Sequence, residues 1–513
     1  MNFKNPIISG FYPDPSICRV GADYYLVNSS FHYFPGVPIF HSQDLVNWRQ
    51  IGHCLTRPQQ LSIPKVGSSM GIFAPTIRYY NEYFYMITTV ITGRADSEIR
   101  NFYVRASNPA GPWSDPVFLD WPGIDPSLFF DEDGSVYITG TNALSSQEAG
   151  IYQAELDIET GKLNSQRQLI WTGTGGKAPE GPHLYRINGY YYLLIAEGGT
   201  EYGHMVTIAR SSSPYGPFES APNNPILSQR STAYPIQAAG HADFVQAHDG
   251  SWWAVMLGIR PFSRRHHLGR ETYLSKVEWS EDGWPVIGDN GHIHPEMEGP
   301  SFYTGALPDK NELDHFNSAE LDDVWNFARN PQPEDWSLQT RSGWLTLHGS
   351  AVTLDDVDSP AFVARRQQHF NCSASARLEF EPGHKDEAGL TVYMNELHHY
   401  EIALTRVDGQ RSVILRKRVG SVWMIAEQHP YNENHIIMDI VANPKEYSFY
   451  YRNPEHADSK LLGYAESSLL ATEVAGGFTG VYIGLYATGN GDKASSPAYF
   501  DWFHYQTPAL VTN

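Results

Sequence analysis

The sequence predicts an all-β protein in which a five-bladed β-propeller is followed by a β-sandwich. Three observations favour this fold: the length of 513 residues, the abundance of rings and turn formers, and one strand-turn-strand pattern that recurs five times. The chain is longer than the roughly 100–200 residues of one domain. Its 44 Gly, 34 Pro and 31 Tyr have no short period and are typical of many strands joined by tight turns.

The recurring pattern occupies the first half of the chain. It begins with a polar residue beside a Pro or Gly, continues through a hydrophobic strand, turns, and returns through an aromatic strand. The five copies open at Asp14, Thr76, Asp125, Glu180 and His241, in steps of 62, 49, 55 and 61 residues. Each step accommodates about four strands, and four-stranded units arranged around an axis form a propeller. We therefore predict five blades within residues 1–302.

The repeat ends after Pro300, and residues 303–313 form a polar stretch suited to a linker. From Asp314 onward, short alternating segments such as Ala374–Phe380 and Ala498–Tyr505 are separated by turn signals. This pattern indicates a sandwich of two antiparallel sheets over residues 314–513.

Charge and cysteine content restrict the partners and the compartment. The 57 acidic and 36 basic residues give a net charge of -21, which repels nucleic acid and anionic membrane surfaces. We expect neither as a partner, and the substrate is expected to be neutral or cationic. The N-terminal residues lack the apolar run of a signal peptide, and the three cysteines are too few and too widely spaced for a disulfide framework. These features predict a cytoplasmic protein.

Carboxylates at the repeated position suggest chemistry. If the copies are blades, their opening residues converge at one end of the axis, where Asp14, Asp125 and Glu180 would meet. Propeller packing does not require carboxylates there, and neighbouring like charges raise the pKa of at least one carboxyl group, which can then act as a general acid. A phosphate-binding loop, a nucleophile elbow and a metal-spaced His/Cys cluster are all missing. Paired carboxylates in an aromatic funnel fit glycoside hydrolysis best.

Each of these residues also has a purely structural interpretation. Asp14 and Asp125 precede prolines and could be only turn formers, although two such copies together with Glu180 favour a site. We expect His241 to bind rather than to catalyse. Phe31 and Phe73 lie in predicted loops, where their rings could stack on a sugar.

Arg270, which follows the fifth copy, would lower the pKa of a carboxyl group that it pairs with. A surface ion pair is its alternative role.

Three stretches resemble glycoside hydrolase family 43, in the branch of β-xylosidases with a five-bladed propeller and a C-terminal sandwich. They are Asn5–Ser16, Gly123–Ser127 and Ala178–His183. The likeness extends over essentially the whole chain. It implies an inverting, exo-acting hydrolase.

By this resemblance Asp14 matches the general base, Glu180 the general acid, and Asp125 the residue that orients the acid and raises its pKa. Phe31, His241 and Arg270 match residues that line the sugar pocket. Phe73 departs from the family pattern, which places Trp before Ala-Pro, and its smaller ring would widen or reshape the pocket.

Several alternatives stay open at this point. The two-domain form favours release of xylose from the non-reducing end of β-1,4-xylooligosaccharides, but α-L-arabinofuranosidase or bifunctional activity fits the same carboxylates. A non-catalytic sugar-binding propeller is the alternative of another class. No cofactor is required, although an axial divalent cation such as calcium could lie near His241.

We expect a homo-oligomer, and we expect the sandwich to close the pocket through the loop Ala487–Pro497. In the strand after this loop, Phe500, Trp502 and Phe503 either support such a lid or pack only the sandwich core, and for these strand residues we favour the core.

Overall fold

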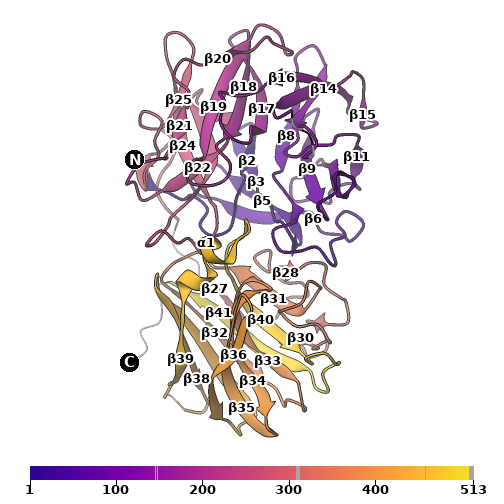
Figure 1. Cartoon of the computed structure of the whole chain (residues 1–513), viewed down its shortest axis with the longest axis vertical. Coiled ribbons are helices and arrows are strands. Elements are labelled where there is room, and N and C mark those ends of the chain that lie inside the picture. Colours follow the sequence, from indigo (N-terminus) through magenta and orange to yellow (C-terminus); the bar gives the residue numbers. More distant parts are fainter. Residues whose placement is uncertain (145, 147, 308–311, 457, 508–513) are drawn as a thin grey trace.

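The structure is a computed structural model that describes residues 1–144, 146, 148–307, 312–456 and 458–507. The described chain forms a body of small sheets from its first part and a body of two large sheets from its second part (Figure 1). Helical turns in the described residues are confined to η1 (Asp96–Glu98), η2 (Ser467–Leu470) and α1 (Thr472–Ala475). None of these helices is long and apolar enough to cross a membrane. The predicted all-β class is confirmed.

Each of the five sequence repeats forms the antiparallel hairpin that begins one sheet. The first two sheets consist of β2 (Ser16–Val20), β3 (Asp23–Val27), β5 (Gly36–Ser42) and β6 (Arg49–Leu55), and of β7 (Gly71–Ile72), β8 (Thr76–Tyr80), β9 (Tyr83–Ile91), β10 (Ile99–Ala106) and β11 (Val117–Leu119). The third consists of β12 (Ser127–Phe130), β13 (Val136–Thr141), β14 (Ile151–Asp157), β15 (Lys162–Leu163) and β16 (Gln168–Trp171).

The fourth sheet consists of β17 (Glu180–Ile187), β18 (Tyr190–Glu197), β19 (Met205–Ser211), β20 (Glu219–Ser220) and β21 (Leu227–Ser228). The fifth consists of β22 (Gln237–Gln246), β23 (Trp252–Ile259), β24 (Glu271–Trp279) and β25 (Pro285–Ile287). The innermost strands β2, β8, β12, β17 and β22 contact one another in turn, and β22 contacts β2. The sheets are therefore the blades of the predicted propeller.

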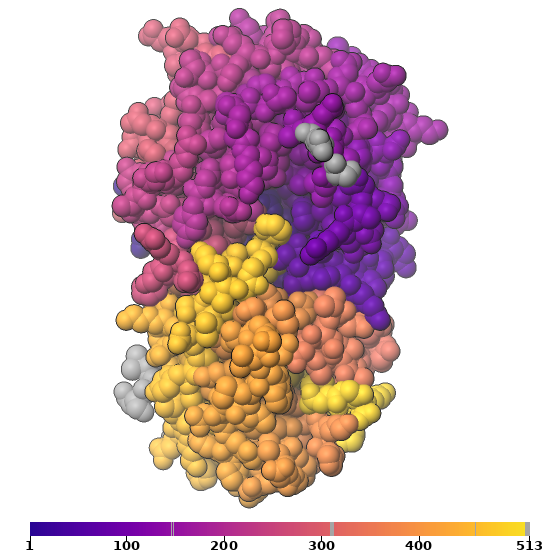
Figure 2. All heavy atoms as spheres, in the orientation of Figure 1, coloured from indigo at the N-terminus to yellow at the C-terminus, as the bar shows by residue number. Residues whose placement is uncertain are grey.

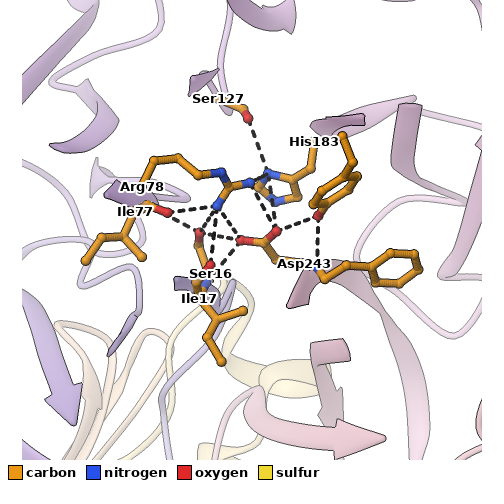
Figure 3. A network of polar contacts seen from close by, with 9 residues as sticks. Ser16, Ile17, Ile77, Arg78, Ser127, His183 and Asp243 are labelled. Carbon is orange, nitrogen blue, oxygen red and sulfur yellow. Dashed lines mark hydrogen bonds and ion pairs between the residues drawn. The ribbon is translucent and has the colours of Figure 1, made fainter. Parts of the chain in front are cut away.

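A buried polar network joins the innermost strands at the axis (Figure 3). The Arg78 guanidinium donates to both carboxylate oxygens of Asp243, at 2.8 and 3.1 Å, and to His183 Nδ1 at 3.0 Å. The Ser16 hydroxyl donates to Asp243 at 2.6 Å, and Ser127 Oγ lies 3.3 Å from His183 Nδ1. All five innermost strands contribute to this network, so it fixes their relative positions.

The second body is a sandwich of two antiparallel sheets. One sheet has the order β29 (Trp336–Ser337), β30 (Leu345–Leu347), β41 (Ala498–Gln506), β32 (Cys372–Glu379), β37 (His435–Ala442), β38 (Glu446–Arg452) and β39 (Lys460–Glu466), with β27 (Glu312–Asp314) also paired to β41. The other has the order β31 (Ala361–Arg366), β40 (Tyr482–Thr488), β33 (Glu387–Asn395), β34 (His398–Val407), β35 (Gln410–Val419) and β36 (Val422–Pro430). Residues 308–311 of the predicted linker lie outside the described residues.

The two bodies share a continuous interface. β4 (Tyr33–Phe34) of the propeller pairs with β28 (Phe327–Ala328) of the second body, and the Tyr33 and Tyr482 rings stack with centroids 3.8 Å apart. One hydrophobic cluster runs from the first two blades into the sandwich. β1 (Asn2–Lys4) pairs with β26 (Glu296–Glu298), which joins the two ends of the propeller segment. Because the domains bury apolar surface against each other, they form one packed unit.

The buried Arg78–Asp243 ion pair is expected to contribute to the free energy of unfolding. Removing one partner of a buried pair leaves the other charge unpaired and costs about 3–5 kcal/mol. We expect Arg78→Met to lower the free energy of unfolding by this amount, as measured by urea unfolding. Arg105→Met is the matched control, because Arg105 pairs with the exposed Glu159, and such surface pairs contribute about 0–1 kcal/mol. Equal unfolding midpoints for the two variants would contradict the structural role of the axial pair.

Candidate active site

A cavity of about 510 Å³ lies at one end of the propeller axis. All seven predicted site residues line it, namely Asp14, Phe31, Phe73, Asp125, Glu180, His241 and Arg270. The second repeat contributes Phe73 and Ala74 to the lining in place of its opening residue Thr76, which is buried elsewhere. The convergence expected for Thr76 is therefore wrong, whereas the other four opening residues meet in one place.

The backbone is strained at three of these residues, two of them just before an innermost strand and His241 within β22. Asp14, Asp125 and His241 have φ of 52°, 54° and 49°, in the left-handed region that Asp and His tolerate better than most side chains. Such conformations persist only where the surrounding structure enforces them, and they cluster at functional sites. Here they occur where three different blades reach the cavity.

Asp14 is held as a carboxylate. Arg270 Nη1 donates to Asp14 Oδ1 at 2.8 Å, and the Ser29 hydroxyl donates to Oδ2 at 2.5 Å. Burial alone would raise the pKa of Asp14, but the charge of Arg270, the electrostatic influence of His241 and the Ser29 hydrogen bond hold this pKa below its usual 3.8. An ionised, buried carboxylate of this kind can accept a proton from water.

The pKa of Glu180 is shifted in the opposite direction to that of Asp14. Burial, followed by the negative charge of Asp14, raises the pKa of Glu180 from 4.5 to about 7. A carboxyl group that is still protonated near neutral pH can donate a proton to a leaving group. Asp14 and Glu180 thus form a pair of carboxyl groups whose pKa values are shifted apart, which is the electrostatic signature of an acid and a base.

Asp125 interacts electrostatically with both Asp14 and Glu180. Its Oδ2 accepts a hydrogen bond from the Gly181 amide at 3.1 Å, directly after Glu180 in the chain. Burial and the negative charges of Glu180 and Asp14 raise the pKa of Asp125 well above its usual range. The Gly181 contact fits an orienting role. The pKa of Glu180 is raised by burial and Asp14, so the specific effect expected from Asp125 stays a prediction.

Two histidines border the carboxyl groups. Burial lowers the pKa of His241, so that its ring is neutral near pH 7 and can hydrogen-bond to hydroxyl groups. Gly181, with φ of 57°, makes room for this ring, because a Cβ there would lie 2.8 Å from His241 Cε1. His204 also lines the cavity, and its Nδ1 contacts the Gly199 carbonyl at 2.7 Å. Sequence reasoning missed His204, which lies outside the repeated pattern.

An aromatic wall completes the cavity, and the sandwich supplies part of it. The Phe31 ring lies 5.2 Å from Phe73 and 6.0 Å from Phe478, which precedes β40. The Arg270 guanidinium carbon is 5.6 Å from the centre of the Phe31 ring and 5.8 Å from that of Phe478. Arg270 is therefore held between rings from both domains while it contacts Asp14.

The sandwich reaches the cavity through a segment other than the predicted one. Residues of the loop Ala487–Pro497 bond to residues 349–351 and 385–386 of the sandwich itself, and none of them lines the described cavity. Phe500 and Phe503 belong to the sandwich core. The expected lid loop is thus wrong. The Gly476-Gly477-Phe478 sequence was the available signal, because two glycines before an exposed ring indicate a loop.

A positive charge is already present at the axial position where the sequence left room for a divalent cation. Asp243, the axial carboxylate nearest in sequence to His241, is already neutralised by Arg78, which also donates to His183. The described residues contain no group of three or more His, Cys, Asp or Glu side chains arranged to hold a metal ion.

A propeller whose axial cavity pairs a carboxylate with a protonated carboxyl group defines a glycoside hydrolase. Residues 3–285 match the family model described as glycosyl hydrolases family 43, and residues 313–506 match the β-xylosidase C-terminal concanavalin A-like domain. The chain belongs to glycoside hydrolase family 43. The predicted family and enzyme class are confirmed, and the non-catalytic propeller is not supported.

Relatives of the chain carry more than one activity name. It is 44% identical over 98% of its length to a non-reducing-end α-L-arabinofuranosidase of Bacteroides ovatus, covering 94% of that protein. It is 39% identical to a xylosidase/arabinosidase of Butyrivibrio fibrisolvens, with 98% of each chain covered. The structure of a xylan β-1,4-xylosidase from Bacillus halodurans superposes with a TM-score of 0.93 at 35% identity, covering 98% of this chain and 100% of that one.

The pKa shifts predict a bell-shaped pH dependence. Activity requires Asp14 ionised and Glu180 protonated, so kcat/KM should fall as the pH rises through about 7 and fall again as the pH drops below 3.8. Because the charge of Arg270 lowers both pKa values, Arg270→Gln should move both limbs to higher pH.

The exposed Arg264 provides the control variant Arg264→Gln, whose profile should match that of the unchanged protein. An unshifted acidic limb in Arg270→Gln would contradict the role of Arg270.

Proposed function

We propose that this enzyme is an exo-acting, inverting β-xylosidase that releases xylose from the non-reducing end of β-1,4-xylooligosaccharides. The opposite pKa shifts of Asp14 and Glu180 within one small cavity carry the proposal. The volume of about 510 Å³ lies within the roughly 300–1,000 Å³ of pockets that enclose a small ligand. Such a pocket suits a terminal sugar better than the interior of a polymer.

In this mechanism Glu180 protonates the glycosidic oxygen while Asp14 removes a proton from the attacking water. Arg270 and Ser29 keep Asp14 ionised through their hydrogen bonds to its two carboxylate oxygens. Phe31, Phe73 and Phe478 present apolar ring faces to the sugar, and His241 and Arg270 offer polar groups to its hydroxyls. Inversion follows because water attacks the face of the sugar opposite the leaving group.

An α-L-arabinofuranosidase is the second candidate. The names of two relatives support it, since one is an α-L-arabinofuranosidase and the other a xylosidase/arabinosidase. Both candidates use the same acid and base, so they differ only in how the pocket fits the sugar ring.

Further properties are part of the proposal. We infer that no divalent cation is needed, because Arg78 supplies the axial positive charge, and a chelator should leave activity unchanged.

We infer a cytoplasmic role in xylan degradation, which is supported by three free, buried cysteines and testable by cell fractionation. We also infer a homo-oligomer through the exposed side chains Val422, Trp423 and Met424 of the edge strand β36, testable by light scattering.

A substrate panel tests the proposed activity. We expect 4-nitrophenyl β-D-xyloside to be cleaved with a higher kcat/KM than 4-nitrophenyl α-L-arabinofuranoside, and α-xylose to appear first in a proton NMR time course. A preference for the arabinofuranoside would favour the second candidate. The appearance of β-xylose first would require a retaining mechanism, and no turnover of either substrate would overturn the proposal.

Substitutions of the two carboxyl groups test their roles. Glu180→Ala should lower turnover of xylobiose by roughly a hundredfold or more, and that of an activated aryl xyloside much less, since a good leaving group needs little protonation. Asp14→Ala should be nearly inactive on both substrates. Glu132→Ala is the control, because that side chain is largely exposed on the third blade. Equal losses on both substrates in Glu180→Ala would remove it from the acid role.

A further inference from the structure

A segment of the sandwich crosses onto the propeller next to the cavity. Residues 471–480, here called the strap, contain α1 and Phe478 and connect η2 to β40. In Figure 2 the yellow C-terminal part of the chain reaches up beside a hollow in the propeller, and Figure 1 places α1 at this boundary. The strap is therefore the part of the sandwich that meets the catalytic cavity.

Phe478 separates two cavities. The catalytic cavity of about 510 Å³ and a second cavity of about 430 Å³ share Thr200, Arg270 and Phe478 in their linings. The second cavity is otherwise lined by strap residues and by propeller residues such as Tyr202 and His266. Movement of the Phe478 ring would join the two spaces, so its position decides whether the sugar site is closed on this side.

One carboxylate fixes the strap to the propeller. Glu473 accepts hydrogen bonds from the His266 amide at 3.0 Å, from His266 Nδ1 at 2.8 Å and from the Tyr202 hydroxyl at 3.1 Å. Burial would raise the pKa of Glu473, but its hydrogen bonds and charge interaction with His266 lower it to about 2. The carboxylate therefore stays charged at any working pH.

Between Glu473 and Phe478 the strap contacts the sandwich at Ala475, whose carbonyl accepts a hydrogen bond from Asn395 Nδ2 at 3.1 Å, and then reaches a pair of glycines. Gly476 and Gly477 have φ of 73° and 82°, and glycines leave the backbone free to adopt other conformations. Beyond them, the Phe478 amide donates to Ser69 Oγ at 2.8 Å, and its carbonyl accepts a 3.5 Å contact from Arg270. Along the chain, the Glu473 contacts therefore come after the body of the sandwich and before the flexible glycine pair.

We propose that Glu473 is a positioning residue that keeps Phe478 at the wall of the sugar site and against Arg270. Glu473 lines only the second cavity, so it acts through the strap and touches no reacting group. The inference rests on the proposed hydrolysis of a terminal sugar, but it does not depend on the choice between xyloside and arabinofuranoside.

The experiment combines kinetics with hydrogen exchange in the full-length enzyme. Glu473→Ala removes all three contacts, Glu473→Gln retains part of them, and Phe478→Ala removes the ring. Glu466→Ala is the matched control, because Glu466 is an exposed carboxylate at the end of β39 whose side chain accepts a hydrogen bond from the neighbouring Ser468 hydroxyl. The substrate is whichever of the two 4-nitrophenyl glycosides the unchanged enzyme cleaves faster.

We expect Glu473→Ala to raise KM by about tenfold with a smaller change in kcat, since misplaced binding groups cost ten- to a hundredfold. Glu473→Gln should be intermediate. In the Phe478→Ala background, Glu473→Ala should have no further effect. Amide exchange of the strap should be faster in Glu473→Ala and unchanged in Glu466→Ala.

Three results would overturn the inference. They are unchanged exchange in Glu473→Ala, faster exchange with unchanged KM, and losses that multiply in the double variant. If the unchanged enzyme cleaves neither glycoside, the proposed function fails, while the exchange data still show whether Glu473 fixes the strap.

Discussion

The buried Arg78–Asp243 pair is the interaction on which the rest of the molecule depends. In three blades a member of the axial network follows a cavity residue by two positions. Ser16 follows Asp14, Ser127 follows Asp125, and Asp243 follows His241. Fixing the network therefore fixes the chain next to the residues that open into the cavity from the first, third and fifth blades. In the fourth blade the register shift between Glu180 and His183 lengthens the spacing by one residue.

The catalytic cavity uses buried charge in two opposite ways. Both Asp14 and Glu180 lie in a protein interior that penalises ionisation, but the direct hydrogen bond from Arg270 goes to Asp14. Once Arg270 has stabilised Asp14 as an anion, that anion itself helps to keep Glu180 protonated. One arginine therefore creates the difference between base and acid. Because the Arg270 guanidinium is delocalised and planar, it can also lie between the Phe31 and Phe478 rings.

Much of this could be predicted from the sequence, because a repeated local pattern specifies both blade number and convergence. The five hairpins and the meeting of Asp14, Asp125, Glu180 and His241 follow from that repeat, and the sandwich follows from the alternating segments after Asp314. Thr76 shows its limit: the second blade presents Phe73 and Ala74 instead, and a pattern cannot reveal which side chain of a turn faces a cavity. Phe478 was not predictable from the propeller repeat, since it reaches the site only through packing between distant parts of the chain.

The shared interface explains why the sandwich can take part in catalysis. A ring supplied by a loosely tethered domain could not hold Arg270 in place, because independent domain motion would exceed the distances involved. Here β4 pairs with β28, Tyr33 stacks on Tyr482, and one apolar cluster spans both bodies. The sandwich is therefore fixed against the propeller, and the strap can bring Phe478 to the wall of the site. The site belongs to neither domain alone, since the cation that sets the pKa of the base is held between aromatic rings from both.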